Sequence, residues 1–441
     1  MRDASLNMLH RLARSAAAVL LALGAATAAQ AQLRIEITSG VTDPVPIAIV
    51  PFARAVPADG GLDVADVVTR DLAGSGRFKP LPRSQMTSTP TRAEDVVLAD
   101  WRISGDYVVV GRVTPLDGGQ LAVDFDLLNA LNGQRVVTQR FTGTQAALRN
   151  AAHRVSDVIF EKILGIRGAF ATRIAYVSVD GTPPSQRFQL LVADADGENP
   201  RMILESRAPI MSPSWSSDGQ WLAYVSFEGR RSAVYVQRIR SGERTKVSAR
   251  AGINGAPAFS PDGRKLALTL GGTGGNPDIY LLDLQTQGLT RITDDPAIDT
   301  EAVWSPDGVA LYFTSDRAGA PQIYRIGTNP GDRPKRLTFT GTYNARPRVS
   351  PDGTQLAMMT LDQGAYRIAV QDVANGTQRV LSRGRQDESP SYAPNGAMLI
   401  YSGSEGGRDT LATVSTDGLT GQRLKSDQGE VREPTWGPFA Q

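Results

Sequence analysis

Histidine is scarce in this chain, which limits the catalysis that its side chains could perform. His10 and His153 are the only histidines among 441 residues, and the chain has no cysteine. A Ser-His-Asp triad needs an imidazole base, and zinc sites are usually built from His and Cys ligands. His10 belongs to a segment that we expect to be removed, and His153 falls on the polar side of a predicted helix, as a solvated surface histidine would. We therefore expect no catalytic residues, no metal site and no cofactor.

Aspartate is the potentially catalytic residue type that recurs at a regular spacing. Asp218, Asp262, Asp307 and Asp352 each precede a glycine in a Ser-Ser-Asp-Gly or Ser-Pro-Asp-Gly sequence, and Asn395 takes this place in a fifth copy. Paired carboxylates can hydrolyse glycosides, so a propeller hydrolase acting on envelope glycans is the alternative function. The tight turns in which these residues stand favour a turn-capping role instead.

The repeated turns predict a six-bladed β-propeller. Each turn follows an aromatic or β-branched residue, or Tyr-Ala in the fifth copy, and precedes a short apolar strand. Their glycines lie 44, 45, 45 and 43 residues apart. A type I turn favours Ser first, Pro second and Gly fourth, and four short strands per repeat of this length is typical of a propeller blade. A WD40 propeller would require Gly-His and Trp-Asp dipeptides, and the repeats contain no histidine.

The two ends of the repeat region predict how the ring closes. Residues 174–178 read as a second strand without a preceding turn, and a truncated sixth copy, Trp436-Gly437-Pro438-Phe439, ends the repeats. Residues 433–436 should therefore supply the missing inner strand of the first blade, which leaves no open edge between blades. A solenoid would instead need polar capping repeats at both ends.

A different pattern precedes the propeller. We expect a strand over 45–50, a helix from Asp63, strands over 107–113, 121–127 and 136–141, and a final helix that stops at Gly165. The fold class is thus an α/β N-terminal domain followed by an all-β six-bladed propeller closed by the C-terminal strand. The expected domains are a signal peptide over 1–31, the α/β domain with an extended N-terminal segment over 32–167, and the propeller over 168–441.

The N-terminus and the charge balance indicate an exported protein. Arg2, Arg11 and Arg14 precede an apolar run over 16–29 that ends in Ala-Gln-Ala, as in a secretory signal peptide. The run is shorter than the roughly 20 residues of a membrane-spanning helix, and no cysteine follows it to receive a lipid, so we expect no membrane insertion. Lys and Arg number 47 against 45 Asp and Glu, and removal of 1–31 leaves 44 of each. Without a basic excess or stripe, nucleic-acid binding is not expected.

A propeller exposes a channel mouth that is surrounded by one loop from each blade, and this mouth is a binding surface. The loops that enter the predicted inner strands mix charged, amide and small apolar residues, which suits a protein partner.

Several motifs together resemble the TolB family. They are Val50-Pro51-Phe52, the run over 254–263 (Asn-Gly-Ala-Pro-Ala-Phe-Ser-Pro-Asp-Gly) and the ending Pro434-Thr435-Trp436-Gly437-Pro438-Phe439. The resemblance covers essentially the whole chain after residue 31. It implies a non-enzymatic, monomeric scaffold of the Tol-Pal system in the periplasm, which links the lipoprotein Pal to TolA, maintains the outer membrane and supports its constriction during cell division.

The resemblance also implies two binding sites. Pal would contact the channel mouth at Ile253, Asn254, Gly255, Ala256, Thr300, Glu301, Arg346, Glu388 and Arg432. TolA would bind the N-terminal segment at Gln32, Leu33, Arg34, Ile35, Glu36, Ile37 and Thr38. Ile253 departs from the family pattern, in which histidine is frequent there, so we expect backbone contacts but no side-chain hydrogen bond at this position.

The N-terminal segment has an alternating pattern, with apolar residues at 33, 35 and 37 and polar residues between them. Such a segment can be an edge strand of its own domain, or it can add to the sheet edge of another protein. Both states together would form an order-disorder switch that couples the two partners.

Overall fold

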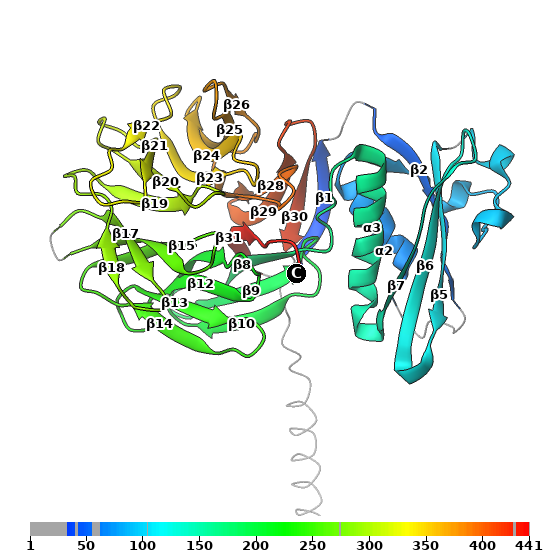
Figure 1. Cartoon of the computed structure of the whole chain (residues 1–441), viewed down its shortest axis with the longest axis horizontal. Helices are drawn as coiled ribbons and strands as arrows, with labels where there is room; N and C mark the ends of the chain where they lie inside the picture. Colours follow the sequence, from blue (N-terminus) through cyan, green and yellow to red (C-terminus); the bar gives the residue numbers. More distant parts are fainter. Residues whose placement is uncertain are drawn as a thin grey trace, which may run out of the picture. The chain divides into compact units, whose positions relative to one another are not determined.

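Two architectures follow each other along the chain, first a mixed sheet with helices and then a ring of small antiparallel sheets (Figure 1). The computed structural model describes residues 33–39, 43–54, 62–103, 105–272, 275–426 and 429–440. The predicted signal peptide and Gln32 lie outside these ranges. Within them, no helix has the length and apolar character that crossing a membrane requires.

The first sheet has the strand order β4-β2-β5-β6-β7, and β3 pairs with β5. β2 runs parallel to β4 and β5, whereas β5, β6 and β7 form an antiparallel meander. The strands are β2 (Val45–Ile49), β3 (Ala53–Arg54), β4 (Phe78–Pro80), β5 (Tyr107–Pro115), β6 (Gln120–Asn129) and β7 (Arg135–Thr144).

Two α-helices cover one face of this sheet, as Figure 1 shows. α2 (Val64–Gly74) begins at Asp63, whose side chain accepts hydrogen bonds from the N–H groups of the first turn. α3 (Leu148–Leu164) ends at Gly165 in the left-handed conformation, which glycine adopts without strain. Both predicted helices are therefore confirmed. Short 3₁₀ turns complete the domain at η1 (Arg83–Gln85), η2 (Ala93–Asp95), η3 (Leu98–Asp100), η4 (Asp117–Gly119) and η5 (Gln145–Ala147).

Six antiparallel sheets form the propeller, and this confirms the predicted number of blades. Blade 1 contains β31 (Glu430–Trp436), β8 (Arg173–Asp180), β9 (Arg187–Asp194) and β10 (Arg201–Ser206). Blades 2 and 3 contain β11 (Ile210–Trp215), β12 (Trp221–Ser226), β13 (Ala233–Arg238), β14 (Arg244–Ser248), β15 (Ile253–Phe259), β16 (Lys265–Gly271), β17 (Asp278–Asp283) and β18 (Leu289–Arg291).

The remaining blades repeat the pattern of four strands. Blades 4 and 5 contain β19 (Asp299–Trp304), β20 (Ala310–Ser315), β21 (Gln322–Gly327), β22 (Lys335–Arg336), β23 (Asn344–Val349), β24 (Gln355–Asp362), β25 (Ala365–Asp372) and β26 (Gln378–Val380). Blade 6 contains β27 (Glu388–Tyr392), β28 (Met398–Glu405), β29 (Arg408–Ser415) and β30 (Gly421–Ser426).

The C-terminal strand closes the ring as predicted. β31 pairs antiparallel with β8, from Glu430 opposite Val179 to Trp436 opposite Ile174. Indole groups tie neighbouring inner strands together, because Trp215 donates a hydrogen bond to the Thr435 carbonyl of blade 1 at 3.1 Å. Trp304 makes the same bond to Ala258 of the preceding blade at 3.0 Å. These tryptophans therefore fasten one blade to the next.

The repeated aspartates stabilise their turns. In the blade 3 turn, the Ser260 hydroxyl donates to Asp262 at 2.6 Å, and the N–H of Arg264 donates to the same carboxylate at 3.1 Å. Asp307 and Asp352 accept equivalent bonds. These hydrogen bonds, first the one from Ser260, lower the pKa of Asp262, so it stays ionised. The capping interpretation is confirmed for these residues.

The N-terminal segment forms a strand, β1 (Leu33–Ser39), at the outer edge of blade 6. It pairs antiparallel with β30, from Leu33 opposite Ser426 to Ser39 opposite Gly421, with one irregularity near its end. The pattern of alternation therefore predicted the strand correctly. Its partner is a propeller sheet and not the sheet of the α/β domain.

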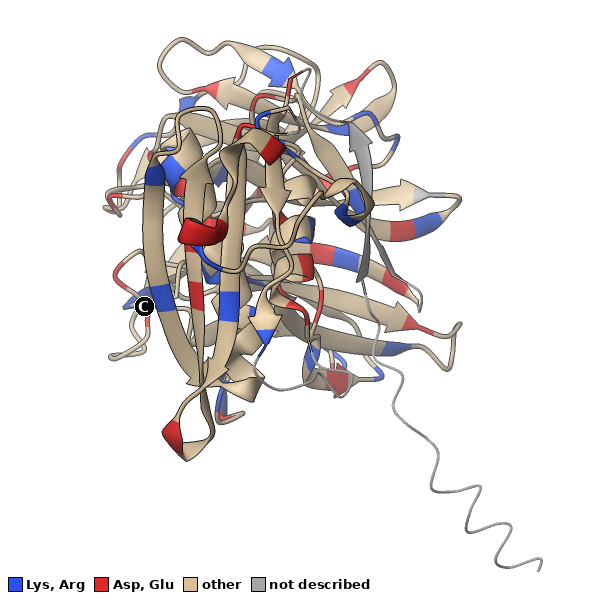
Figure 2. Cartoon of the chain, turned by 90° about the vertical axis from the view of Figure 1, so that its right-hand side faces the viewer, with Lys and Arg blue, Asp and Glu red and all other residues tan. Residues whose placement is uncertain are grey.

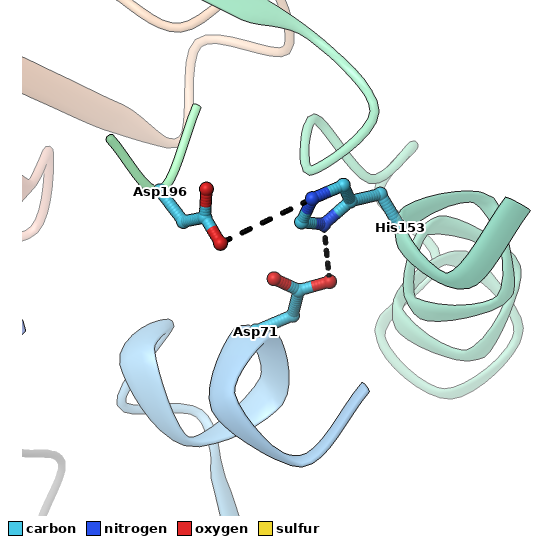
Figure 3. A group of neighbouring side chains, drawn as sticks. All are labelled: Asp71, His153 and Asp196. Atoms are coloured by element: carbon cyan, nitrogen blue, oxygen red, sulfur yellow. Dashed lines mark hydrogen bonds and ion pairs between the residues drawn. The ribbon is translucent and has the colours of Figure 1, made fainter. Parts of the chain in front are cut away.

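His153 is buried, and our expectation of a solvated surface histidine is wrong. Only 1% of the residue is exposed. Its Nδ1–H donates to Asp71 of α2 at 2.8 Å, and Ser156 donates to the same carboxylate at 2.6 Å. Its Nε2 faces the end of β9 in blade 1, where Asp194 lies 3.9 Å away. Asp196, in the turn that follows, lies 4.0 Å from the same nitrogen (Figure 3). The side of α3 that carries His153 thus faces carboxylates of other elements and not water.

The charges around His153 are balanced by protein groups. Asp71, His153 and Asp196 offer three possible metal ligand atoms within 4.8 Å of one another. However, Arg149, one turn before His153 on α3, pairs with Asp194 at 3.1 Å and also with Asp196. Since Arg149 and a protonated His153 already supply positive charge, the geometry favours an ion-pair cluster over a metal site.

Burial alone would lower the pKa of His153, but Asp71, Asp196 and Asp194 outweigh it and raise this pKa from 6.5 to about 9. The resulting stabilisation is fully present below pH 6.5 and is lost as the pH rises through 9. Asp157, also on α3, loses its proton at a lower pH than His153 does. Burial raises the pKa of Asp157 to about 6.

We expect the free energy of unfolding to fall by roughly 3 kcal/mol as the pH rises from 6.5 to beyond 9, because the imidazolium loses its charge there. Urea titrations at a series of pH values measure this slope. The His153→Gln variant is the control and should lack it. An equal slope in both proteins would contradict the account.

Candidate protein-docking site at the propeller channel

Every inner strand of the propeller contains a bulge at the same place. The pairing register between the first and second strand shifts once in each blade. At each shift one non-glycine residue has a φ between 45° and 58°. Left-handed backbone costs such a residue on the order of 1 kcal/mol, so its recurrence marks a feature that the surrounding ring enforces. These six residues, which we call the first ring, are Ser212, Ala256, Glu301, Arg346, Ser389 and Glu433.

The first ring surrounds the entrance of the central channel. A depression of about 640 Å³ lies on the side of the loops that enter the inner strands, and a cavity of about 350 Å³ continues along the channel. Five first-ring residues line both spaces, namely Ser212, Ala256, Glu301, Arg346 and Glu433. The depression is therefore the channel mouth, and the first ring is its floor.

Charged first-ring residues are tied to one another. Arg346 pairs with Glu301 at 3.1 Å and with Glu388 at 3.3 Å. Burial alone would lower the pKa of Arg346, but the neighbouring glutamates raise it, so it remains a cation. Glu433 accepts a hydrogen bond from the N–H of Ser212, and burial raises its pKa. The mouth therefore carries charges of both signs, with Arg346 held by Glu301 and Glu388, rather than a field of one sign.

Most predicted mouth residues meet in this depression. Its lining includes Ile253, Asn254, Gly255, Ala256, Thr300, Glu301 and Arg346. Glu388 joins them through its ion pair with Arg346. Arg432 is outside the lining, and its guanidinium lies 5.8 Å from the centre of the Phe188 ring.

Asn254 has a structural role inside the mouth. It is only 1% exposed, and its side-chain oxygen accepts bonds from Ser248 at 2.6 Å and from the Arg250 N–H at 2.9 Å. Its Nδ2 donates to the Arg250 carbonyl at 2.8 Å. The side chain thus shapes the loop, whereas the neighbouring Ile253 is 48% exposed and open to a partner.

The rim of the mouth carries exposed apolar side chains. Met211, Ile298 and Phe339 are exposed and, like Ile253, lie in or next to the loops that lead into inner strands. Apolar groups exposed around a polar ring are typical of a protein interface.

Three first-ring residues, Ser212, Ser389 and Glu433, are not among the residues that the sequence analysis assigned to Pal. The sequence does contain a pattern that marks Ser212 and Ser389, because each first-ring residue of blades 2 to 6 lies seven positions before the glycine of its turn. Proline follows the first-ring residue in five of the six strands. Only the bulge shows why that offset matters, since a regular strand would point the residue elsewhere.

Figure 2 shows acidic and basic residues interspersed on the side that it draws. This agrees with the balanced composition of 47 basic and 45 acidic residues.

Comparisons with known proteins place the chain in a family. The TolB amino-terminal domain family matches residues 33–136, and the TolB beta propeller domain family matches residues 160–440. The Tol-Pal system protein TolB of Xylella fastidiosa is 45% identical over 417 residues, which cover 93% of this chain and 94% of the relative. The protein of the same name from Xanthomonas campestris is 45% identical and covers 96% of both chains.

A solved structure agrees with these relatives. The crystal structure of TolB from Acinetobacter baumannii matches with a TM-score of 0.85 and 40% identity, over 92% of this chain and all of that chain. The α/β domain, the closed propeller and the two matching domain families together show that the chain belongs to the TolB family of Tol-Pal system proteins.

Proposed function

We propose that the chain is a monomeric periplasmic docking protein that binds the lipoprotein Pal at the channel mouth and TolA through its N-terminal segment. It is a non-enzymatic component of the Tol-Pal system. By linking these two partners it would maintain the outer membrane and help to draw it inward during division. The residues assigned to each partner below are part of this proposal.

The Pal assignment rests on one observation. The propeller has a mouth of about 640 Å³, and the first ring forms its floor. The depression combines accessible apolar groups such as Ile253 with a rigid, internally paired set of charges at Glu301, Arg346 and Glu388. A preorganised polar centre with an apolar rim fits a folded protein partner. Few groups would have to reorganise on docking.

The hydrolase alternative has little support in the geometry. Asp262, Asp307 and Asp352 are occupied by hydrogen bonds of their own turns. The glycines that follow Asp307 and Asp352 face the prolines of the preceding turns. These turns lie at the opposite end of the inner strands from the mouth. Glu301 and Glu433, the carboxylates in the channel, are bound by Arg346 and the Ser212 N–H.

The TolA assignment rests on the place of β1 in blade 6. β1 is the last strand of its sheet, so only one of its edges pairs with β30. Its free edge could receive a strand of TolA, or the whole segment could leave β30 and add to a sheet of TolA. In either case the N-terminal segment is the contact, and docking on blade 6 controls its availability.

A mouth variant tests the Pal site. Ile253→Asp should weaken Pal binding by roughly 2 kcal/mol or more, because it places a charge in the apolar part of the interface. Val309→Asp is the matched control, since Val309 is 57% exposed in a turn at the other end of the inner strands. Calorimetric titration with Pal compares them. Equal affinity of both variants and the parent protein would refute docking at the mouth.

A deletion tests the division of labour between the two sites. Removal of residues 32–43 should abolish TolA binding and leave Pal affinity unchanged or higher, because the described residues that line the mouth all belong to strands and loops of the propeller blades. The same titrations, with TolA and with Pal, measure both effects. Loss of Pal binding in this variant would show that the segment is part of the Pal site.

A further inference from the structure

A second ring of side chains lies in the channel, two residues beyond each bulge. Its six members occupy the same position in their blades. Each is the first residue after the register shift that pairs with the second strand of its blade. All six line the channel cavity. The second ring consists of Ser214, Ala258, Val303, Arg348, Ser391 and Thr435.

Arg348 is the one charged residue among these six. Its Nη1 donates to the carbonyl of Pro347 at 2.8 Å, and within the described part of the chain no carboxylate pairs with it. The nearby glutamates have other partners, since Glu301 binds Arg346 and Glu433 accepts from Ser212. Burial, and then the charge of Arg346, lower the pKa of Arg348 against the opposite effect of Glu301 and Glu433. Arg348 is thus a cation without a counter-ion beside a cavity.

We propose that Arg348 binds the carboxylate of an aspartate or glutamate that a docked protein partner inserts through the first ring. This inference rests on the proposed docking at the mouth and names the chemistry of the group that enters it. Arg348 then sets specificity, because it favours a partner with an acidic side chain at the centre of its interface.

The shape of the channel allows this insertion. Strands advance about 3.3 Å per residue, so the second ring lies about 7 Å below the first. Two first-ring residues of neighbouring blades, Ser212 and Ala256, are small and leave space on their side of the entrance. The cavity of about 350 Å³ begins at the first ring, so an extended acidic side chain could reach the guanidinium from the mouth.

Docking itself creates the need for an anion. While the mouth is open, water can reach the channel and solvate Arg348. A protein seated on the mouth would exclude that water, and an unpaired cation in a closed cavity is strongly unfavourable. A carboxylate answers this need best, because its two oxygens match the planar fork of donors on arginine.

The first test is the affinity of Arg348 variants for Pal. Arg348→Met should weaken binding by about 10-fold or more, since it leaves the inserted carboxylate without a partner. Arg348→Lys should recover part of this loss. The thermal midpoint of Arg348→Met should equal or exceed that of the parent protein, because an unpaired charge has been removed. Arg325→Gln is the matched control, as Arg325 is exposed on the blade 4 strand β21.

The second test identifies the acidic group. Each surface Asp and Glu of Pal is replaced by Asn or Gln, and each variant is titrated against the parent protein and against Arg348→Met. One position should weaken binding to the parent protein but have no further effect on Arg348→Met, which shows that the two groups are coupled.

The results separate this inference from the proposed function. If Ile253→Asp weakens Pal binding and Arg348→Met does not, docking at the mouth stands and the carboxylate inference is overturned. If neither variant has an effect, both are wrong. A third outcome would indicate that Arg348 binds a free anion instead. In that case sodium acetate would stabilise the parent protein but not Arg348→Met, and both proteins would bind Pal with equal affinity, which would overturn the inference.

Discussion

Six inner strands must surround one channel without closing it. In this chain, a bulge in each inner strand satisfies that constraint. The bulge turns one residue per blade toward the mouth at the cost of left-handed backbone, and the next pairing residue lines the channel below it. Ring closure by β31 makes the arrangement complete, because the sixth bulge lies on that strand. The docking surface therefore exists only in the closed propeller, and no single blade could form it.

Electrostatics divides the charged residues of this protein into two kinds. Glu301, Arg346 and Glu388 are paired with one another, as are Arg149 and His153 with the carboxylates of blade 1 and α2. Such groups hold the structure in place, and the first set fixes the shape of the mouth. Arg348 is different, since it donates to the Pro347 carbonyl and no carboxylate among the described residues pairs with it. An unpaired charge in a cavity is where we expect a ligand to act.

The sequence predicted the architecture well because short local patterns specify the turns and the blades of the propeller. Turn residues such as Asp262 and Gly263 specify their turns directly, and the spacing of the copies specifies the blades. The burial of His153 was missed because a helical stripe separates apolar from polar positions and cannot show a polar residue that faces carboxylates of other elements. The first ring was missed in part for a similar reason. A bulge depends on how two strands pair, and Ser212 and Ser389 have no distinctive side chain of their own.

Hydrogen-deuterium exchange of the chain, alone and with Pal, tests the central claim that the partner docks on the first ring. Amide protection on Pal binding should be confined to the loops and strand beginnings around residues 211–213, 253–257, 298–302, 343–347, 386–390 and 431–434. The outer strands of the blades and the α/β sheet should exchange as before. Protection concentrated on the α/β domain or on the turns at the other end of the channel, with the mouth unchanged, would contradict the account.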